Sequence, residues 1–302
     1  MALYRLYCMW LLIPLIVSGD EFESPLKSAV NDADVDADDE QCSVGLQEFS
    51  LAIDGDLTLQ LLQASSAFQG VEHDVTGTVV WGASVCLARF LAKKTGSILR
   101  NKISLELGCG CGLPSLVASK KGVSKRVIAT DLEPATLEQL DSVAKLNGLQ
   151  EDLLELFQLD WKDSYDSSDG NNDVGLRMLE DDEKLLQADV ILASDVIYHN
   201  SMVDPFVQTI DKYLDSTGRA FLALRNTRQG VATLWQKAMP EKGFELVESV
   251  SCDAYLAGGS EASDAEATTV PREFQNEANR HRWHGDHTIY VFQWKTSGDR
   301  AA

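Results

Sequence analysis

A glycine-rich turn in the first half of the chain has the residue types of a cofactor-binding loop. It lies within Ile103-Ser-Leu-Glu-Leu-Gly-Cys-Gly-Cys-Gly-Leu-Pro114, where an apolar run precedes the glycines and a helix-like stretch follows them. Glycine permits backbone angles and close approaches that a side chain forbids, and the start of a helix presents N–H groups to a ligand. This pattern predicts a site for a nucleotide-like cofactor.

The spacing of the glycines narrows the kind of cofactor. Gly108, Gly110 and Gly112 follow the pattern G-x-G-x-G, whereas the dinucleotide fingerprint G-x-G-x-x-G requires a glycine at the position of Leu113. Glu106, just ahead of the loop, would repel a pyrophosphate but would suit a cofactor with an amine and a sulfonium. A nicotinamide-dependent dehydrogenase is therefore a remote alternative.

A second carboxylate ends the next apolar run. Asp131 can accept hydrogen bonds from both hydroxyls of a ribose, as an acidic residue does at this place in nucleotide-binding folds. It can also cap the helix for which Pro134 is a favourable first residue. The two roles are compatible.

The elements that would position these residues form a regular alternation. Strand-like runs are expected at Ile103–Leu107, Arg126–Thr130, Leu153–Leu159, Asp189–Ala193, Arg219–Leu224, Phe244–Val250 and Thr288–Trp294. Helix-like stretches are expected at Val85–Lys94, Leu113–Lys121, Ala135–Leu146, Met202–Leu214 and Val231–Lys242. This alternation predicts an α/β fold, a Rossmann-like doubly wound seven-stranded sheet with helices on both faces. The last strand follows the sixth without a helix, so we expect it to return antiparallel beside it.

The predicted domain covers residues 42–302 and begins with a β-hairpin around Asp54-Gly55. Polar, acidic insertions are expected at 162–187 and 251–286. Ahead of the domain lie an apolar leader at 1–19, which resembles a signal peptide, and an acidic linker at 20–41 with the composition of a disordered segment. The apolar run of the leader is too short for a stable membrane span.

Charge, histidine spacing and cysteine spacing argue against a nucleic-acid partner and against a metal site. The formal net charge of −21 disfavours a nucleic-acid partner, because an acidic surface repels phosphates. His281, His284 and His287 straddle Gly285, so we expect no metal site there. The six cysteines lack the spacing of zinc knuckles, and we expect free thiols in a reducing compartment. They are Cys8, Cys42, Cys86, Cys109, Cys111 and Cys252.

The chain resembles a known family over much of its length. It is similar to the seven-strand class I methyltransferases, and specifically to the protein-lysine methyltransferases called methyltransferase family 16. The resemblance rests on Thr78-Val-Val-Trp81, Leu105–Pro114, Thr130-Asp131, Leu146-Asn-Gly148, Leu159-Asp-Trp161 and Ala193-Ser-Asp-Val-Ile-Tyr-His199. The strand pattern extends the likeness to Trp294.

The resemblance implies S-adenosyl-L-methionine as the cofactor. Asp131 would hold its ribose hydroxyls, Trp161 would pack against its adenine with Asp160 near the amino group, and Ala193 would form a wall of the pocket. The residues around the methionine and ribose would be Trp81, Glu106, Gly108, Cys109 and Gly110. For the two tryptophans, ordinary core packing is the alternative.

The resemblance also implies which residues face the methyl group. Asp195 would orient a lysine ammonium and assist its deprotonation, and the ring of Tyr198 would attract the cation. His199 is either a base or a hydrogen-bonded neighbour. We expect a monomeric cytoplasmic enzyme that methylates an accessible lysine of a protein substrate. The alternatives are a small-molecule or different side-chain acceptor, and a binding module that retains the fold without turnover.

Overall fold

The computed structural model describes residues 46–64, 73–121, 124–149, 153–162, 187–226, 231–256 and 286–295. Its strands are β1 (Leu46–Asp54), β2 (Leu57–Ala64), β3 (Ile103–Leu107), β4 (Arg126–Asp131), β5 (Glu155–Gln158), β6 (Ala188–Ser194), β7 (Leu214–Arg225), β8 (Phe244–Ser251) and β9 (His287–Trp294). Its helices are η3 (His73–Thr78), α1 (Gly82–Ile98), α2 (Leu113–Lys120), α3 (Pro134–Leu146), η6 (Asn200–Met202), α4 (Val203–Tyr213), α5 (Val231–Lys242) and α6 (Asp253–Leu256). No helix within these residues is long and apolar enough to cross a membrane.

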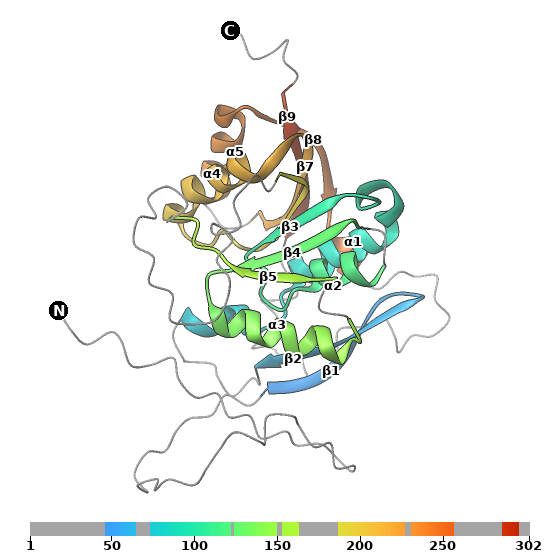
Figure 1. Cartoon of the computed structure of the whole chain (residues 1–302). Helices are drawn as coiled ribbons and strands as arrows, with labels where there is room; N and C mark the ends of the chain where they lie inside the picture. Colours follow the sequence, from blue (N-terminus) through green and yellow to red (C-terminus); the bar gives the residue numbers. More distant parts are fainter. Residues whose placement is uncertain are drawn as a thin grey trace, which may run out of the picture.

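Seven strands form one sheet in the order β5-β4-β3-β6-β7-β9-β8 (Figure 1). All neighbours are parallel except that β9 runs antiparallel to both β7 and β8. The predicted fold, including the antiparallel last strand, is confirmed. The order reverses between β3 and β6, and ligands of such sheets bind at the carboxyl ends of the strands at this reversal.

Helices cover both faces of the sheet, as the alternation predicted. One core joins α1, α2 and α3 to one face, and a second core joins α4 and α5 to the other (Figure 1). Leu105 and Leu107 of β3 belong to the second core, while Glu106 between them hydrogen-bonds to α2 on the opposite face. The period of two along the strand thus sends the carboxylate towards the helix that follows the glycine loop.

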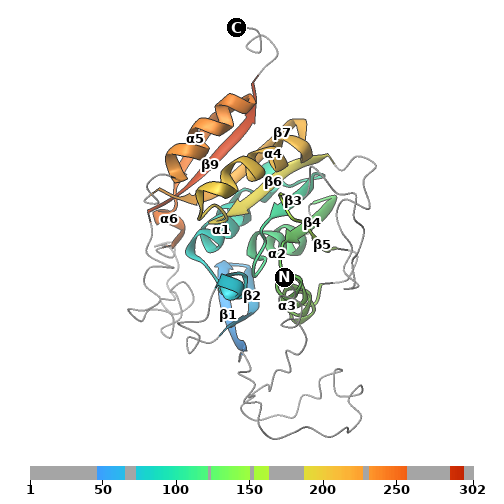
Figure 2. The ribbon, with the colours of Figure 1, turned by 90° about the vertical axis from the view of Figure 1, so that its left-hand side faces the viewer.

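The predicted hairpin of β1 and β2 is also present (Figure 2). Side chains from α1 and from the end of α3 hold it in place. Asn147 exchanges two hydrogen bonds with the backbone of Gln60 in β2, at 2.9 and 2.7 Å. The buried guanidinium of Arg89 in α1 donates to the carbonyl of Ala52 in β1, at 3.3 Å from Nε and 2.9 Å from Nη2. The hairpin therefore packs as part of the α1–α3 layer.

The expectation of free thiols is wrong for two cysteines. Cys86 in α1 and Cys252 after β8 form a disulfide with a Cα–Cα distance of 5.6 Å across a sequence separation of 166. The contact arises only when β8 folds beside β9 over α1, so the spacing in the sequence does not reveal it. Cys109 and Cys111 are free thiols, as expected, and the structure shows that both are buried.

Several sequence predictions lie outside the described residues. These are the leader at 1–19, the linker at 20–41, and most of the acidic insertions at 162–187 and 251–286. The helix α6 is a described part of the second insertion. Of the six cysteines, Cys8 and Cys42 also lie outside.

Candidate active site

The glycine loop joins the end of β3 to α2. Gly108, Gly110 and Gly112 have φ angles of +64°, +51° and +67°, in the left-handed region that favours glycine. The loop is closed by a 2.8 Å hydrogen bond from the amide of Gly112 to the carbonyl of Cys109. The positive φ angles of these three residues therefore favour glycine whether or not a ligand is bound.

The segment η3 lies against this loop. A Cβ on Gly110 would lie 3.2 Å from the carbonyl oxygen of Gly77, and the indole of Trp81 donates to the carbonyl of Thr76 at 3.0 Å. Trp81 is half-buried and precedes the first residue of α1. The structure thus brings the predicted residue Trp81 into the segment that borders the glycine loop.

We expect Gly110→Ala to destabilise the protein by about 1–2 kcal/mol, the cost of a side chain in the left-handed region, with an added cost from crowding Gly77. The matched control is Gly148→Ala, since Gly148 has φ +66° but a Cβ added there would meet no atom within 4 Å. Urea denaturation should show a larger loss for Gly110→Ala, and calorimetry should show weaker S-adenosylhomocysteine binding only for that variant. Equal behaviour of the two variants would contradict the close packing of η3 on the loop.

Asp131 fastens the loop to the next strand. Its Oδ2 accepts a hydrogen bond from the amide of Gly110 at 3.0 Å, and its Oδ1 accepts one from the amide of Glu133 at 3.2 Å. Burial raises the pKa of this carboxyl, and the backbone hydrogen bonds oppose that rise. Each oxygen of a carboxylate can accept more than one hydrogen bond, so these contacts leave capacity for ribose hydroxyls.

Glu106 is fully buried beside the loop. Its Oε2 accepts hydrogen bonds from the amide and the hydroxyl of Ser115 in α2, at 2.9 and 2.5 Å. Its Oε1 is buried without a hydrogen-bond partner among the described residues. Burial raises the pKa of Glu106 to about 8, although the bonds from Ser115 act in the opposite direction. An unsatisfied carboxylate oxygen at this place fits a ligand that brings an amine donor.

Three predicted segments meet at Gly108. A Cβ on this residue would lie 2.8 Å from Cγ1 of Val196 and 3.5 Å from Cζ2 of Trp161. The segments that follow β5 and β6 therefore converge on the end of β3. The ring of Trp161 also packs against Phe206 of α4, with centroids 5.1 Å apart, so it has a core contact besides any role at a ligand.

Three further predicted cofactor residues occupy the same strand ends. Oδ1 of Asp160 accepts a hydrogen bond from the amide of Lys162 at 2.8 Å, which forms a turn next to Trp161. Ala193 is fully buried near the end of β6, within the core shared with α4 and α5. The amide of Cys109 donates to the carbonyl of Thr130 at 2.8 Å, and burial raises the pKa of its thiol well above the ordinary value.

The two predicted acceptor-side residues follow β6. Asp195 has a φ of +52°, and its amide donates to the carbonyl of Ala223 in β7 at 2.9 Å. Its side chain is only 4% exposed, and Oδ2 lies 3.9 Å from Nη2 of Arg225. Tyr198 is 51% exposed. A buried carboxylate and an accessible ring therefore lie within one short segment at the carboxyl edge of the sheet.

His199 matches the second of its two interpretations. Its Nδ1 accepts a hydrogen bond from the amide of Ser201 at 3.3 Å and lies 2.8 Å from the hydroxyl of the same residue. The imidazole thus caps the short helix η6. This is the geometry of a hydrogen-bonded neighbour.

Sequence reasoning missed residues that support the site from a distance. The amide of Gln139 in α3 donates to the carbonyl of Leu62 at 2.8 Å and lies 3.4 Å from that of Thr78, so it joins the hairpin to η3. Arg225, the last residue of β7, lies beside Asp195. No local pattern marks either residue, because their partners are distant in sequence.

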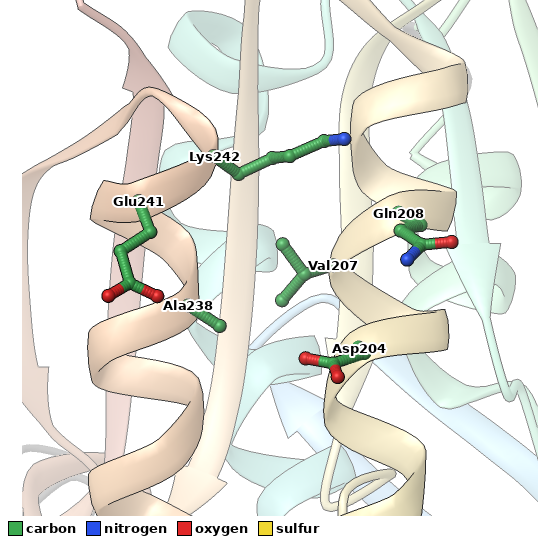
Figure 3. Close-up of a pocket in the computed structure, with 6 residues that line it drawn as sticks. All are labelled: Asp204, Val207, Gln208, Ala238, Glu241 and Lys242. Atoms are coloured by element: carbon green, nitrogen blue, oxygen red, sulfur yellow. The ribbon is translucent and has the colours of Figure 1, made fainter.

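One surface pocket lies away from these residues, between α4 and α5 (Figure 3). It is lined by Asp204, Val207, Gln208, Ala238, Glu241 and Lys242. Nζ of Lys242 lies 2.8 Å from Oδ2 of Asp211, so an ion pair joins the two helices beside it. None of the predicted site residues lines this pocket.

The sheet order, the antiparallel β9 and the G-x-G-x-G loop at the β3–β6 reversal are those of the class I S-adenosylmethionine-dependent methyltransferase fold. A family model described as lysine methyltransferase matches residues 66–239, which is more than half of the chain. The chain belongs to this lysine methyltransferase family, Methyltransf_16.

Curated relatives agree with this assignment. The protein-lysine N-methyltransferase EEF2KMT of Mus musculus is 33% identical over 42% of this chain and 37% of its own length. The protein-lysine N-methyltransferase EFM3 of Chaetomium thermophilum is 28% identical over 46% of this chain and 39% of its own length. The protein N-terminal and lysine N-methyltransferase EFM7 of Candida glabrata is 30% identical over 48% of this chain and 54% of its own length. The chain thus matches only about two fifths to one half of the length of these relatives.

Proposed function

We propose that this protein transfers a methyl group from S-adenosylmethionine to a lysine side chain of a protein substrate. The observation that carries the proposal is that Trp161 and Val196, the residue after Asp195, both converge on Gly108 of the loop expected to hold the cofactor. Membership of the lysine methyltransferase family supports the same activity. The net charge of −21 favours a basic protein over a nucleic acid as the acceptor.

The residues present fit S-adenosylmethionine. Asp131 would accept hydrogen bonds from its ribose hydroxyls, and the unsatisfied Oε1 of Glu106 would accept from its amine, directly or through a water. Trp81 and Trp161 would border the methionine and adenine ends. When bound, S-adenosylmethionine supplies a methyl carbon already activated by the positive sulfur.

The work left to the protein is alignment of the amine and exclusion of water. A lysine amine is protonated at neutral pH and must lose a proton before it can act as a nucleophile. We assign Asp195 to orient the ammonium and to accept its hydrogen bond while the proton passes to solvent water. The exposed ring of Tyr198 would attract the cation as it enters the site.

The test is transfer of radiolabelled methyl groups from S-adenosylmethionine to a lysate of the organism's own cells. We expect label on a protein, recovered as methyl-lysine after hydrolysis, and a loss of at least about tenfold for Asp195→Asn. The matched control is Asp204→Asn in the first turn of α4, which should keep wild-type activity. Label in a soluble metabolite, or cofactor binding without any transfer, would contradict the proposal.

A further inference from the structure

The end of β7 carries a half-buried cation next to the proposed acceptor carboxylate. Arg225 is the last residue of β7, and Asp195 directly follows the neighbouring parallel strand β6. Their side chains are 15% and 4% exposed, and Nη2 of Arg225 lies 3.9 Å from Oδ2 of Asp195. Burying a carboxylate to this extent is unfavourable without a positive charge nearby. Arg225 supplies that charge.

The contact between Nη2 of Arg225 and Oδ2 of Asp195 is long for an ion pair. At 3.9 Å the two atoms are beyond hydrogen-bond distance, so this contact is an attraction between charges without a shared proton. A bidentate pair would occupy both oxygens of the carboxylate. The contact through Nη2 holds Asp195 electrostatically and does not itself use an acceptor position of Oδ2.

Contacts with β9 fix the position of the backbone at Arg225. Arg225 is the Cα partner of His287 in the ladder between β7 and β9. The next residue, Asn226, donates through its side-chain amide to Asp286 at 2.8 Å and to Thr288 at 2.9 Å. Its amide oxygen accepts a hydrogen bond from the hydroxyl of Tyr290 at 2.5 Å. The strand end that carries Arg225 is thereby fixed to β9.

We propose that Arg225 is a positioning residue that acts through Asp195, holding this carboxylate in the orientation in which it receives the lysine amine. The role rests on the proposed function, since it presupposes that Asp195 faces the acceptor. It adds a residue of β7 to the acceptor site, which otherwise consists of the segment that follows β6. Catalytic alignment is sensitive to shifts of about 1 Å, so a loosened carboxylate is expected to slow transfer.

The test compares Arg225→Met, Arg225→Lys, Asp195→Asn and the double variant Arg225→Met/Asp195→Asn. Initial rates are measured with lysate protein as the acceptor and varied S-adenosylmethionine. We expect Arg225→Met to lower the apparent kcat by about five- to tenfold, with the KM for S-adenosylmethionine unchanged. Arg225→Lys should stay within about threefold of wild type, because it retains the charge. In the Asp195→Asn background, Arg225→Met should cost less than about twofold, since residues that act as a unit are not additive.

The matched control is Arg219→Met, which removes an exposed arginine from the middle of β7 and should leave the rate unchanged. Multiplicative losses in the double variant would overturn the proposal, as would equal losses for Arg225→Lys and Arg225→Met. A raised KM for S-adenosylmethionine in Arg225→Met would also overturn it, because that result indicates general distortion of the site. Wild-type transfer to lysine tests the proposed function separately, so an active wild type with multiplicative losses rejects only the role of Arg225.

Discussion

Reduction of the Cys86–Cys252 disulfide is expected to lower the melting temperature by about 10 °C. In the chain-entropy model, a cross-link that closes a loop of more than about 100 residues contributes about 4–5 kcal/mol, and measured values are commonly about 2–4 kcal/mol. The loop closed here spans a sequence separation of 166. For a domain of this size, each kcal/mol of lost stability lowers the melting temperature by roughly 2–4 °C. A loss of about 3–4 kcal/mol therefore corresponds to a decrease of about 10 °C.

The location of the Cys86–Cys252 disulfide indicates which elements of the fold should become more mobile first after reduction. Cys252 follows the edge strand β8, and its amide donates to the carbonyl of His287 at 3.0 Å. Close by, Nη1 of Arg89 in α1 donates to the carbonyl of Tyr255 in α6 at 2.7 Å. The disulfide and this hydrogen bond together fasten the end of β8 and α6 to α1. After reduction, hydrogen exchange should rise in β8 and α6 before it rises in β3 or β4.

The measurement is thermal unfolding with and without a reductant, together with thiol counting in denaturant. Reduction should release two additional thiols and lower the melting temperature. The control is Cys86→Ala/Cys252→Ala, whose melting temperature should not respond to the reductant. An unchanged melting temperature in the reduced wild type would show that the bridge contributes little. Because cells differ in whether they keep thiols reduced, trapping the thiols at lysis would show which form prevails there.

Local patterns were sufficient to predict most of the fold. Alternating apolar runs gave the strands β3 to β9, and the spacing of Gly108, Gly110 and Gly112 distinguished the loop from a dinucleotide site. These signals are local because strand period, helix period and glycine conformations are set by neighbouring residues. The sequence predicted that the last strand returns beside the sixth. It did not predict that β9 lies between β7 and β8, since sheet order depends on contacts between distant segments.

The features of the fold and the site that the sequence did not predict depend on contacts between distant segments in the same way. The disulfide joins α1 to the end of β8, and the pair of Arg225 and Asp195 joins the ends of two strands. Neither contact has a characteristic spacing in the sequence. The segment around Gly77 packs against Gly110 for a comparable reason, because the hairpin and Gln139 bring η3 onto the loop. Residue types indicated the candidates, and only the fold showed which of them meet.

Cofactor binding is expected to release a proton, and Glu106 is the proposed source. Burial raises its pKa to about 8 from an ordinary value near 4.5, so the carboxyl is largely protonated at pH 6.5 in the protein without ligand. An amine bound at its unsatisfied Oε1 would favour the charged form and lower the pKa again. Binding of S-adenosylhomocysteine at pH 6.5 should therefore release up to about one proton, and its affinity should rise by at most about tenfold per pH unit between pH 6 and 8.

The raised pKa of Glu106 also makes the free energy of unfolding depend on pH. Between about pH 4.5 and 8 the folded protein binds more protons at Glu106 than the unfolded chain does. The free energy of unfolding contributed by this group is therefore fully present below pH 4.5 and decreases as the pH rises to about 8. Without ligand the protein should unfold more easily at pH 8 than at pH 6 on account of this residue, and bound S-adenosylhomocysteine should reduce that difference.

Calorimetry of S-adenosylhomocysteine binding in two buffers of different ionisation enthalpy measures the released proton directly. Glu106→Gln preserves the size of the side chain but cannot ionise, so its binding should release no proton and its affinity should change little between pH 6 and 8. The matched control is Glu138→Gln on the exposed face of α3, which should behave as the wild type. Equal proton release by the wild type and Glu106→Gln would show that another group responds to the ligand. Proton release that depends on Glu106 would instead assign the buried carboxylate beside Gly108 to the amine of the cofactor.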